Sequence, residues 1–158
     1  MRIGIGFDIH RLVPERPLIL GGVSIPWSKG LLGHSDADVL LHALCDALLG
    51  ATGQGDMGTH FPDTDPQWAN ASSQIFLSKA LELVKACRMS IANVDFVVLL
   101  EEPRLGSIRP MIQKRIAEVL HLEDRQVNLK AKTMEGLGSI GQGEAIAAYA
   151  VVLLKEAQ

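Results

Sequence analysis

The chain opens with the stretch IGIGFDIH at residues 3–10, which bears on both the fold and the chemistry. Its apolar residues recur at every second position, and this is the period of a β-strand. Alternate side chains of a strand point to opposite faces, so Asp8 and His10 project together, away from the apolar side chains. The stretch therefore predicts a strand that presents a carboxylate and an imidazole side by side.

Outward from this strand, an apolar run at residues 17–25 is interrupted by two glycines, which favours a bent strand or a hairpin. The segment SDAD at residues 35–38 resembles the start of a helix, with a capping hydroxyl followed by early acids. We expect this helix to continue to about Leu49 and to be stopped by Gly50 and Gly53.

The rest of the chain predicts further helices and strands. Residues 50–71 show no periodicity, which indicates a long functional or mobile connection. The tail at residues 145–154 is ambiguous, because its alanines favour a helix while its adjacent valines and flanking glycines permit a strand. No repeat or linker divides the chain, so we expect one α+β domain over residues 1–158. The other patterns predict a helix at 73–89, a strand at 94–100, a helix at 107–120 and a strand at 126–132.

Composition excludes some classes of protein. With 15 basic and 18 acidic side chains the net charge is −3, whereas general nucleic-acid binding usually needs a basic face. Any phosphate ligand would therefore need local cations or a metal ion. Cys45 and Cys87 stand alone in apolar surroundings, which favours buried, reduced thiols. There is no signal-peptide pattern and no apolar run of membrane-spanning length, so we expect a cytoplasmic protein without membrane contact.

Asp8, His10 and His42 are the candidate metal ligands. One carboxylate and two imidazoles suit zinc, and three protein ligands leave a fourth position open for chemistry. His42 shares a helical face with Asp38 and Asp46, and an aspartate beside a metal-bound histidine often accepts its other ring proton. The alternative is a strand end with a polar face, since no spacing rule brings His42 to the other two ligands.

Several longer motifs follow one another in order over essentially the whole chain. They are GFDIH at residues 6–10, GHSDADV at 33–39 followed by His42, GDMG at 55–58, FPDTD at 61–65, KTMEGLG at 132–138 and GQGE at 141–144. Together they resemble the motifs of the 2-C-methyl-D-erythritol 2,4-cyclodiphosphate synthase family. The resemblance implies a mixed sheet with helices packed on one face, assembling as a homotrimer with active sites between neighbouring subunits.

The activity that this resemblance implies is a cyclisation. Members of the family convert 4-diphosphocytidyl-2-C-methyl-D-erythritol 2-phosphate to 2-C-methyl-D-erythritol 2,4-cyclodiphosphate and release CMP, in the non-mevalonate pathway to isoprenoid precursors. By resemblance, Asp8, His10 and His42 bind Zn²⁺ or Mn²⁺, whose open position takes a phosphate oxygen. Glu135 would hold a second ion, Mg²⁺ or Mn²⁺, although a lone glutamate in a glycine-rich loop is usually only solvated.

The same resemblance assigns phosphate contacts to side chains near both ends of the chain. His34 and Ser35 would contact substrate phosphate, and His34 would help to stabilise the transition state. Capping of the helix is an alternative role for Ser35, and both roles can coexist at a helix N-terminus. Thr133 would bind phosphate and stabilise the transition state, and Lys132 could add a direct phosphate contact.

The remaining substrate contacts implied by the family fall on three segments. The ribose would be held by Asp56, Met57 and Gly58. The erythritol end would be covered by Phe61, Pro62, Asp63, Thr64 and Asp65, unless these residues form only a polar surface turn. The cytosine pocket would be built, largely by backbone groups, from Leu100, Glu101, Glu102, Pro103, Arg104, Leu105 and Gly106. Further substrate contacts would include Asp8, His10, Met134 and Glu135.

The sequence departs from the family pattern at Ser139 and Gln142, where relatives often carry an aromatic residue and an arginine. In those relatives the two side chains line a central cavity between subunits that can hold a diphosphate-bearing isoprenoid. Neither residue here supplies a cation, so we do not expect that ligand to bind. Two other functions would use the same ligands: a metal-dependent phosphohydrolase, and a non-catalytic metal- or nucleotide-binding trimer.

Overall fold

The computed structural model describes residues 1–157, and its centre is one mixed sheet. The strands lie in the order β4-β1-β7-β5-β6, with β5 and β6 parallel and the other neighbours antiparallel. The mixed sheet of an α+β fold is therefore confirmed. The strands are β1 (Arg2–Pro14), β4 (Lys29–Leu32), β5 (Met89–Leu99), β6 (Val127–Lys132) and β7 (Ala145–Glu156).

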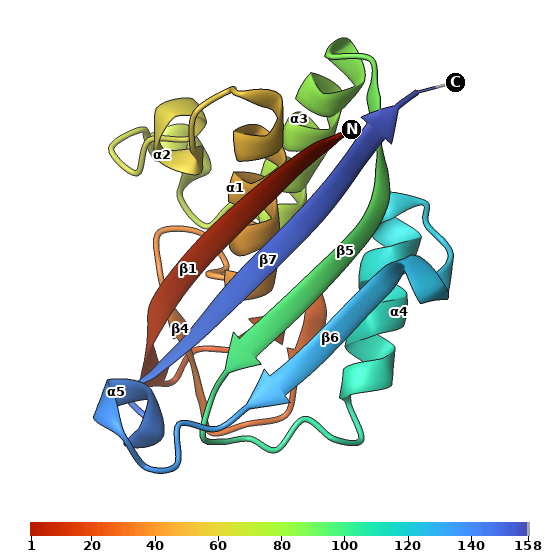
Figure 1. Cartoon of the computed structure of the whole chain (residues 1–158). Coiled ribbons are helices and arrows are strands. Elements are labelled where there is room, and N and C mark those ends of the chain that lie inside the picture. Colours follow the sequence, from red (N-terminus) through yellow and green to blue (C-terminus); the bar gives the residue numbers. More distant parts are fainter. Residues whose placement is uncertain (158) are drawn as a thin grey trace.

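The three long helices lie behind this sheet, and the other face is left uncovered (Figure 1). They are α1 (Val39–Thr52), α3 (Ser73–Ala86) and α4 (Arg109–Leu120). α1 packs on β1 and β7, α3 on α1 and β5, and α4 on β6, with one cluster of buried apolar side chains between them. The expected arrangement of helices on one face is thus confirmed. None of the helices in residues 1–157 is long and apolar enough to cross a membrane.

The apolar run at residues 17–25 forms a hairpin of β2 (Leu18–Leu20) and β3 (Val23–Ile25). Its two-residue turn consists of Gly21 and Gly22, whose φ angles are +61° and +75°. A two-residue hairpin turn with positive φ at both positions strongly favours glycine. The glycines that interrupt the apolar pattern therefore mark the turn between two strands.

β1 and α1 approach each other unusually closely, because β1 has two glycines on its helix-facing side. A Cβ at Gly4 would lie 1.9 Å from the carbonyl oxygen of Ala47, and one at Gly6 would lie 1.9 Å from that of Ala43. Only a residue without a side chain leaves room for backbone at this distance. The next two positions on the same face of β1 carry the candidate metal ligands, so they too point toward α1.

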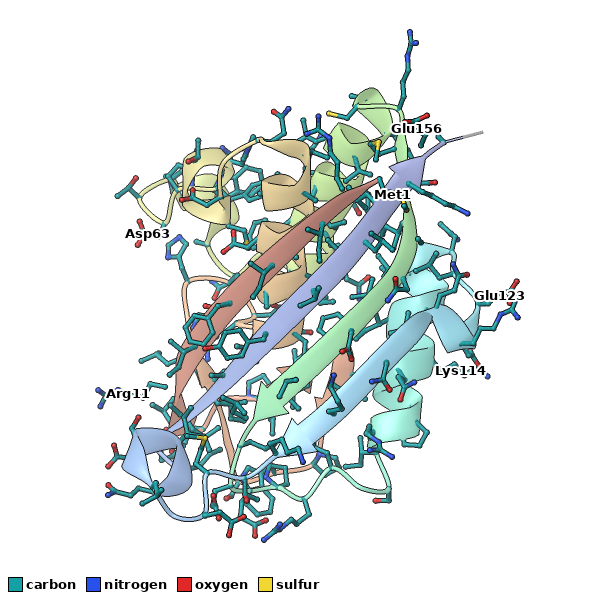
Figure 2. The ribbon with its side chains drawn as sticks, in the orientation of Figure 1. Met1, Arg11, Asp63, Lys114, Glu123 and Glu156 are labelled. Atoms are coloured by element: carbon teal, nitrogen blue, oxygen red, sulfur yellow. The ribbon has the colours of Figure 1, made fainter. Side chains whose placement is uncertain are left out.

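Side chains, and no helix, cover the near face of the sheet (Figure 2). The apolar side chains of β1 that alternate with these residues point to that face and are exposed. Ile3 is 72% exposed and Ile5 67% exposed, and Phe7 stacks on Tyr149 of β7 with ring centroids 4.7 Å apart. We call this group the front patch: Ile3, Ile5, Phe7, Ile9, Tyr149 and Val151, all of which are exposed. The alternation in β1 therefore identifies a strand, but its apolar side is not the side that faces the core.

The expected ends of the first helix need correction. Ser35 does not cap it, because the helix begins at Val39 and Asp38 is its N-cap. Gly50 does not stop it either, because Gly50 lies within the helix and Gly53, with a φ of +70°, forms the C-cap. The connection that follows is also less irregular than its sequence suggests. It contains a short helix α2 (Met57–His60) and a 3₁₀ turn (Pro66–Trp68).

The next differences concern α3 and the tail. α3 ends at Ala86 rather than near residue 89, and Cys87 caps it as an exposed thiol, so the prediction that Cys87 is buried is wrong. Cys45 is buried, as expected. The ambiguous tail is strand β7, which pairs with β1 on one side and β5 on the other. A place between two strands outweighs the helix preference of its alanines.

The close contact between β1 and α1 predicts opposite effects for two glycine-to-alanine changes. Gly6→Ala should destabilise the protein by about 1–3 kcal/mol or more, because the added methyl group meets backbone that cannot move easily. Gly50→Ala is the matched control, since a Cβ there meets only one atom, 4.0 Å away, inside a helix where alanine is favoured by about 1 kcal/mol. Urea unfolding of both variants measures the two effects. Equal stability of Gly6→Ala and Gly50→Ala would contradict the packing described here.

Candidate metal centre and substrate pockets

The three predicted metal ligands meet where β1 crosses α1. Asp8 Oδ2 lies 2.9 Å from His10 Nε2 and 2.9 Å from His42 Nδ1, and the two ring nitrogens are 3.1 Å apart. Within residues 1–157 they are the one group of three or more such side chains close enough to share an ion. The fold therefore supplies the proximity that no sequence spacing could predict.

The geometry of these atoms fits a tetrahedral ion. Ligands about 2.0 Å from a zinc ion with tetrahedral angles lie roughly 3.3 Å from one another, close to the separations in this cluster. Two imidazoles and one carboxylate form a donor set typical of catalytic zinc, with one position left for a substrate. All three side chains are partly or fully buried, so a bound ion would be only partly open to solvent.

His10 is oriented by the backbone of the neighbouring edge strand. Its Nδ1 lies 2.9 Å from the carbonyl oxygen of Leu32 in β4. A carbonyl can only accept a hydrogen bond, so Nδ1 carries the proton and donates it. Nε2, on the other side of the ring, is then the nitrogen that faces Asp8 and His42. This is the arrangement that metal-bound histidines usually show.

In His42 the roles of the two ring nitrogens are reversed relative to His10. Its Nδ1 faces Asp8, while its Nε2 lies 2.8 Å from Ser73 Oγ and 3.2 Å from Ser35 Oγ. The expectation that Asp38 or Asp46 accepts the second ring proton is wrong, because both carboxylates bind backbone N–H groups instead. Helical spacing places the two aspartates on the same side of α1 as His42, but it does not determine where their side chains turn.

Asp38 has a structural role at the start of α1. Its buried carboxylate accepts hydrogen bonds from Gly21 N at 2.9 Å and Gly22 N at 2.6 Å, and from the N–H groups of Leu40 and Leu41 at 3.2 Å each. Burial raises the pKa of Asp38 to about 6, since these donors offset only part of the lost hydration. One side chain thus joins the β2–β3 hairpin to the helix that carries His42.

Asp46, on the same helix, connects α1 to the short helix α2. Its carboxylate accepts a hydrogen bond of 2.8 Å from the backbone N–H of Met57, the first residue of α2. Burial raises the pKa of Asp46, and nearby Asp56 and Asp8 act in the same direction. The contact attaches α2 to α1 and holds Met57, which lines a pocket together with His10 and His42.

The electrostatics of the cluster favour an ionised carboxylate. Burial alone would raise the pKa of Asp8, but the two neighbouring imidazoles, His10 and His42, outweigh it and hold the pKa well below its usual range. For His10, burial acts in the other direction and lowers the pKa. The hydrogen bond of the protonated ring to Asp8 outweighs burial, so the pKa of His10 is raised. Asp8 is therefore ionised and ready to bind a cation at neutral pH.

A pocket of about 330 Å³ opens beside the cluster. Its walls combine the ligands His10 and His42, the turn of Gly33, His34 and Ser35, and four residues from the connection, Met57, Phe61, Asp63 and Trp68. Most predicted contacts with phosphate and erythritol from these segments are thus brought together here. Pro62, Thr64 and Asp65 do not line it; Asp65 instead caps the 3₁₀ turn by accepting from Gln67 N at 3.0 Å.

A second pocket, of about 270 Å³, lies where β5 and β6 end. The N–H of Leu100 donates to the carbonyl of Lys132 at 3.0 Å, which keeps the two strand ends side by side. The predicted cytosine-binding residues line this pocket, except Glu102, together with phosphate-side residues and Arg109: Leu100, Glu101, Pro103, Arg104, Leu105, Gly106, Arg109, Ala131, Lys132 and Thr133. The two pockets share no lining residue.

Glu135, predicted to hold a second metal ion, lies apart from the cluster of Asp8, His10 and His42. It is exposed on the loop after β6 and accepts a hydrogen bond of 2.8 Å from Thr133 Oγ1. The N–H of Met134 donates to Glu101 at 3.2 Å, which ties this loop to the second pocket. Asp56, predicted to bind ribose, is exposed and caps α2 through Thr59 at 2.8 Å.

Sequence reasoning missed three residues of the first pocket region. Ser73 contacts His42 directly, Phe76 lines the pocket, and Trp68 packs against Phe76 with ring centroids 5.7 Å apart. Helical periodicity identified Phe76 only as a core residue. No pattern distinguishes Ser73 from an ordinary residue at a helix start, and its role depends on the packing of α3 against α1.

Comparison with known proteins places this geometry among related chains. The YgbB family model matches residues 1–155. The 2-C-methyl-D-erythritol 2,4-cyclodiphosphate synthase of Synechococcus sp. (strain JA-2-3B'a(2-13)) is 57% identical over 156 residues, which cover 99% of each chain. A solved 2C-methyl-D-erythritol-2,4-cyclodiphosphate synthase in its CDP-bound form matches with a TM-score of 0.90 and 43% identity, over 98% of this chain and 100% of that one. The bifunctional IspDF of Campylobacter jejuni matches with a TM-score of 0.94 and 42% identity, over 98% of this chain and 42% of that longer one.

The raised pKa of His10 predicts that protons compete with metal ions at the cluster. In the metal-free protein the pair formed by His10 and Asp8 adds stability below the ordinary histidine pKa of 6.5, and this is lost as the pH rises through the raised value. A metal ion requires the neutral ring, so the apparent Kd for zinc should rise by about 10–100-fold between pH 7.5 and pH 5.5. Competition with a chromophoric chelator measures it.

The control is His121→Asn, which changes an exposed histidine at the end of α4. His121 has a φ of +55°, and asparagine tolerates that conformation. Its zinc affinity should follow the wild-type pH dependence. A zinc Kd that stays constant from pH 7.5 to 5.5 in the wild type would rule out His10 as a ligand.

Proposed function

Since this chain belongs to the YgbB family, we infer that it forms 2-C-methyl-D-erythritol 2,4-cyclodiphosphate from 4-diphosphocytidyl-2-C-methyl-D-erythritol 2-phosphate and releases CMP. The observation that carries this function is the full-length similarity to synthases of that name, with the cluster of Asp8, His10 and His42 in place. The reaction serves the non-mevalonate pathway to isoprenoid precursors. In reaction class the enzyme is a phosphorus–oxygen lyase.

The reaction requires no nucleophilic side chain of the protein. An oxygen of the substrate's own 2-phosphate attacks the β-phosphorus, a P–O bond closes the ring, and the bond to the CMP oxygen breaks. A phosphate nucleophile is already ionised near pH 7, so no catalytic base is required. Positioning and neutralisation of charge therefore carry the catalysis of this phosphoryl transfer.

Asp8, His10 and His42 hold a divalent ion, Zn²⁺ or Mn²⁺, in this proposal. Support comes from the ligand separations of 2.9–3.1 Å and from the hydrogen bond that orients His10. When bound, the ion polarises a phosphate oxygen and offsets the charge that develops during transfer. Glu135 holds a second ion, Mg²⁺ or Mn²⁺, near the phosphates; its support is the family motif and its place beside Thr133.

Residues around the two pockets bind different parts of the substrate. His34 and Ser35 contact phosphate from the first pocket, and His34 helps to stabilise the transition state. Thr133 and Lys132 contact phosphate from the rim of the second pocket, where the loop of residues 100–106 encloses the cytosine. Phe61 and Asp63, which line the first pocket, lie over the erythritol end. The family motif is the support for Asp56, Met57 and Gly58 as the residues that hold the ribose.

One subunit does not bring the two pockets together, and this supports a shared active site. The pockets have no lining residue in common, yet the proposed substrate must reach both. We propose that the protein is a homotrimer in which the metal pocket of one subunit meets the cytidine pocket of the next. The front patch supports this assembly, because neighbouring exposed apolar side chains on one face of a sheet are typical of a contact surface.

Product analysis tests the function directly. Purified protein with zinc, magnesium and the diphosphocytidyl substrate should give CMP and a cyclic diphosphate, followed by phosphorus NMR and mass spectrometry. A metal-dependent phosphohydrolase would instead add water and give linear products. Intact substrate in the presence of bound metal would indicate a binding scaffold, and either of these outcomes would overturn the synthase assignment.

His42→Ala is the variant that links metal to turnover in the same assay. It should fold but lose zinc, and the rate should fall by at least about a thousandfold, because one ligand of the ion that neutralises phosphate charge is missing. The exposed histidine variant His121→Asn serves as the control and should keep both properties. Full metal content with the wild-type rate in His42→Ala would refute the proposed centre.

The proposed trimer predicts the behaviour of an acidic substitution in the front patch. Ile5→Asp should sediment as a monomer and lose turnover, because a charge replaces an apolar side chain at the centre of the contact. Ile75→Asp is the matched control, since Ile75 is a 46% exposed isoleucine on α3, away from the front patch. It should remain trimeric and active. A wild-type protein that is monomeric at assay concentration and fully active would disprove the shared site.

A further inference from the structure

We propose that Ser73, backed by Asp36, sets the tautomer of His42 and so acts as a positioning residue of the metal centre. The inference rests on the metal site of the proposed function and names the groups that prepare it. Neither residue is a metal ligand, and neither lines the substrate pocket. Their effect on the reaction would therefore pass through His42.

The contacts form a continuous chain of hydrogen bonds behind the metal cluster. Ser73 is the first residue of α3 and is fully buried, with its Oγ 2.8 Å from His42 Nε2. The same hydroxyl donates to one carboxylate oxygen of Asp36, and the other oxygen accepts the backbone N–H of Ser73 at 2.9 Å. Asp36 thereby accepts from both hydrogen-bond donors of Ser73.

The direction of these bonds follows from the number of available protons. A hydroxyl group has one hydrogen, and Ser73 donates it to a carboxylate oxygen of Asp36. Because the Ser73 hydrogen goes to Asp36, Ser73 Oγ can only accept from His42 Nε2, which must then carry the ring proton. In the neutral ring, Nδ1 is left with its lone pair, and Nδ1 is the nitrogen that faces Asp8 and His10.

Ser35 cannot replace Ser73 in this role. Its hydroxyl is farther from His42 Nε2, at 3.2 Å, and it also accepts from the N–H of Ala37 at 3.2 Å. Ser35 lines the substrate pocket, whereas Ser73 does not. A ligand phosphate that binds Ser35 would leave the contact between Ser73 and His42 in place.

The same network attaches the end of the pocket loop to the turn that carries His34. Ala71 accepts a backbone hydrogen bond of 3.1 Å from Asp36, and Asn70 donates one of 2.8 Å to His34. These bonds position Ser73 at the point where the loop ends and α3 begins. The orientation of His42 therefore depends on the packing of this loop against the turn. Ser73 and His42 are 31 residues apart in sequence.

The test compares Ser73→Ala with Ser78→Ala in otherwise intact protein. Ser78 lies on the same helix and donates only to the carbonyl of Gln74, so it is a matched control. Zinc titration against a chromophoric chelator at pH 7.5 should show about 10–100-fold weaker binding for Ser73→Ala and wild-type affinity for Ser78→Ala, as is usual when the hydrogen-bond partner of a metal-bound histidine is removed.

A second measurement reports the tautomer of His42 directly. If Ser73 had only a structural role, its replacement would leave this tautomer unchanged. In metal-free protein labelled with ¹⁵N-histidine, two-bond ¹H–¹⁵N correlations distinguish a proton on Nε2 from one on Nδ1. Wild type and Ser78→Ala should show His42 protonated on Nε2. Ser73→Ala should show a shift toward Nδ1, because Asp8 Oδ2, 2.9 Å away, becomes the better partner for the proton.

Asp36→Asn provides an independent variant if Ser73→Ala folds poorly. It keeps the serine but weakens the acceptor of its hydrogen, so zinc affinity and tautomer should change in the same direction and by less. Unchanged affinity and an unchanged tautomer in either folded variant would overturn the proposal. Failure of the wild type to bind zinc at all would instead refute the proposed metal centre, which separates the two conclusions.

Discussion

The structure depends on the close approach of β1 and α1. Gly4 and Gly6 let the strand pass so near the helix that a methyl group on either would lie 1.9 Å from a helix carbonyl oxygen. Asp8 and His10 continue the same face of β1, so they arrive against α1 at the level of His42. A wider spacing between the two elements would leave the ligands too far apart for one ion. The packing that closes the core thus also brings together the three candidate metal ligands.

Hydrogen bonds orient the two histidines through different ring nitrogens. The backbone carbonyl of Leu32 accepts a hydrogen bond from Nδ1 of His10, and a buried hydroxyl, Ser73, faces Nε2 of His42. Each ring therefore presents a different nitrogen to Asp8. The groups that orient the rings come from β4 and α3, which flank β1 and α1 on either side. A site of this kind is prepared by the surrounding fold before any ligand binds.

The molecule leaves one face of its sheet uncovered (Figure 1). The two candidate substrate pockets share no lining residue. The two features have one explanation in the proposed assembly. Covering the front patch with other subunits would bury its apolar side chains and could bring a metal pocket to a cytidine pocket. The departures at Ser139 and Gln142 lie on and beside the short helix α5 (Gly138–Gly141), outside both pockets.

The sequence by itself determined most of the helices and strands, the three candidate metal ligands and, through its motifs, the family. The period of two in β1 places Asp8 and His10 on one face, because side-chain alternation is a local property of the backbone. Tertiary structure alone decided which face of β1 meets the core, whether the alanine-rich tail is a strand, and that Cys87 is exposed. It also decided that Ser73, rather than Asp38 or Asp46, contacts His42. Such contacts join residues far apart in the chain, so they depend on packing, and no local pattern contains them.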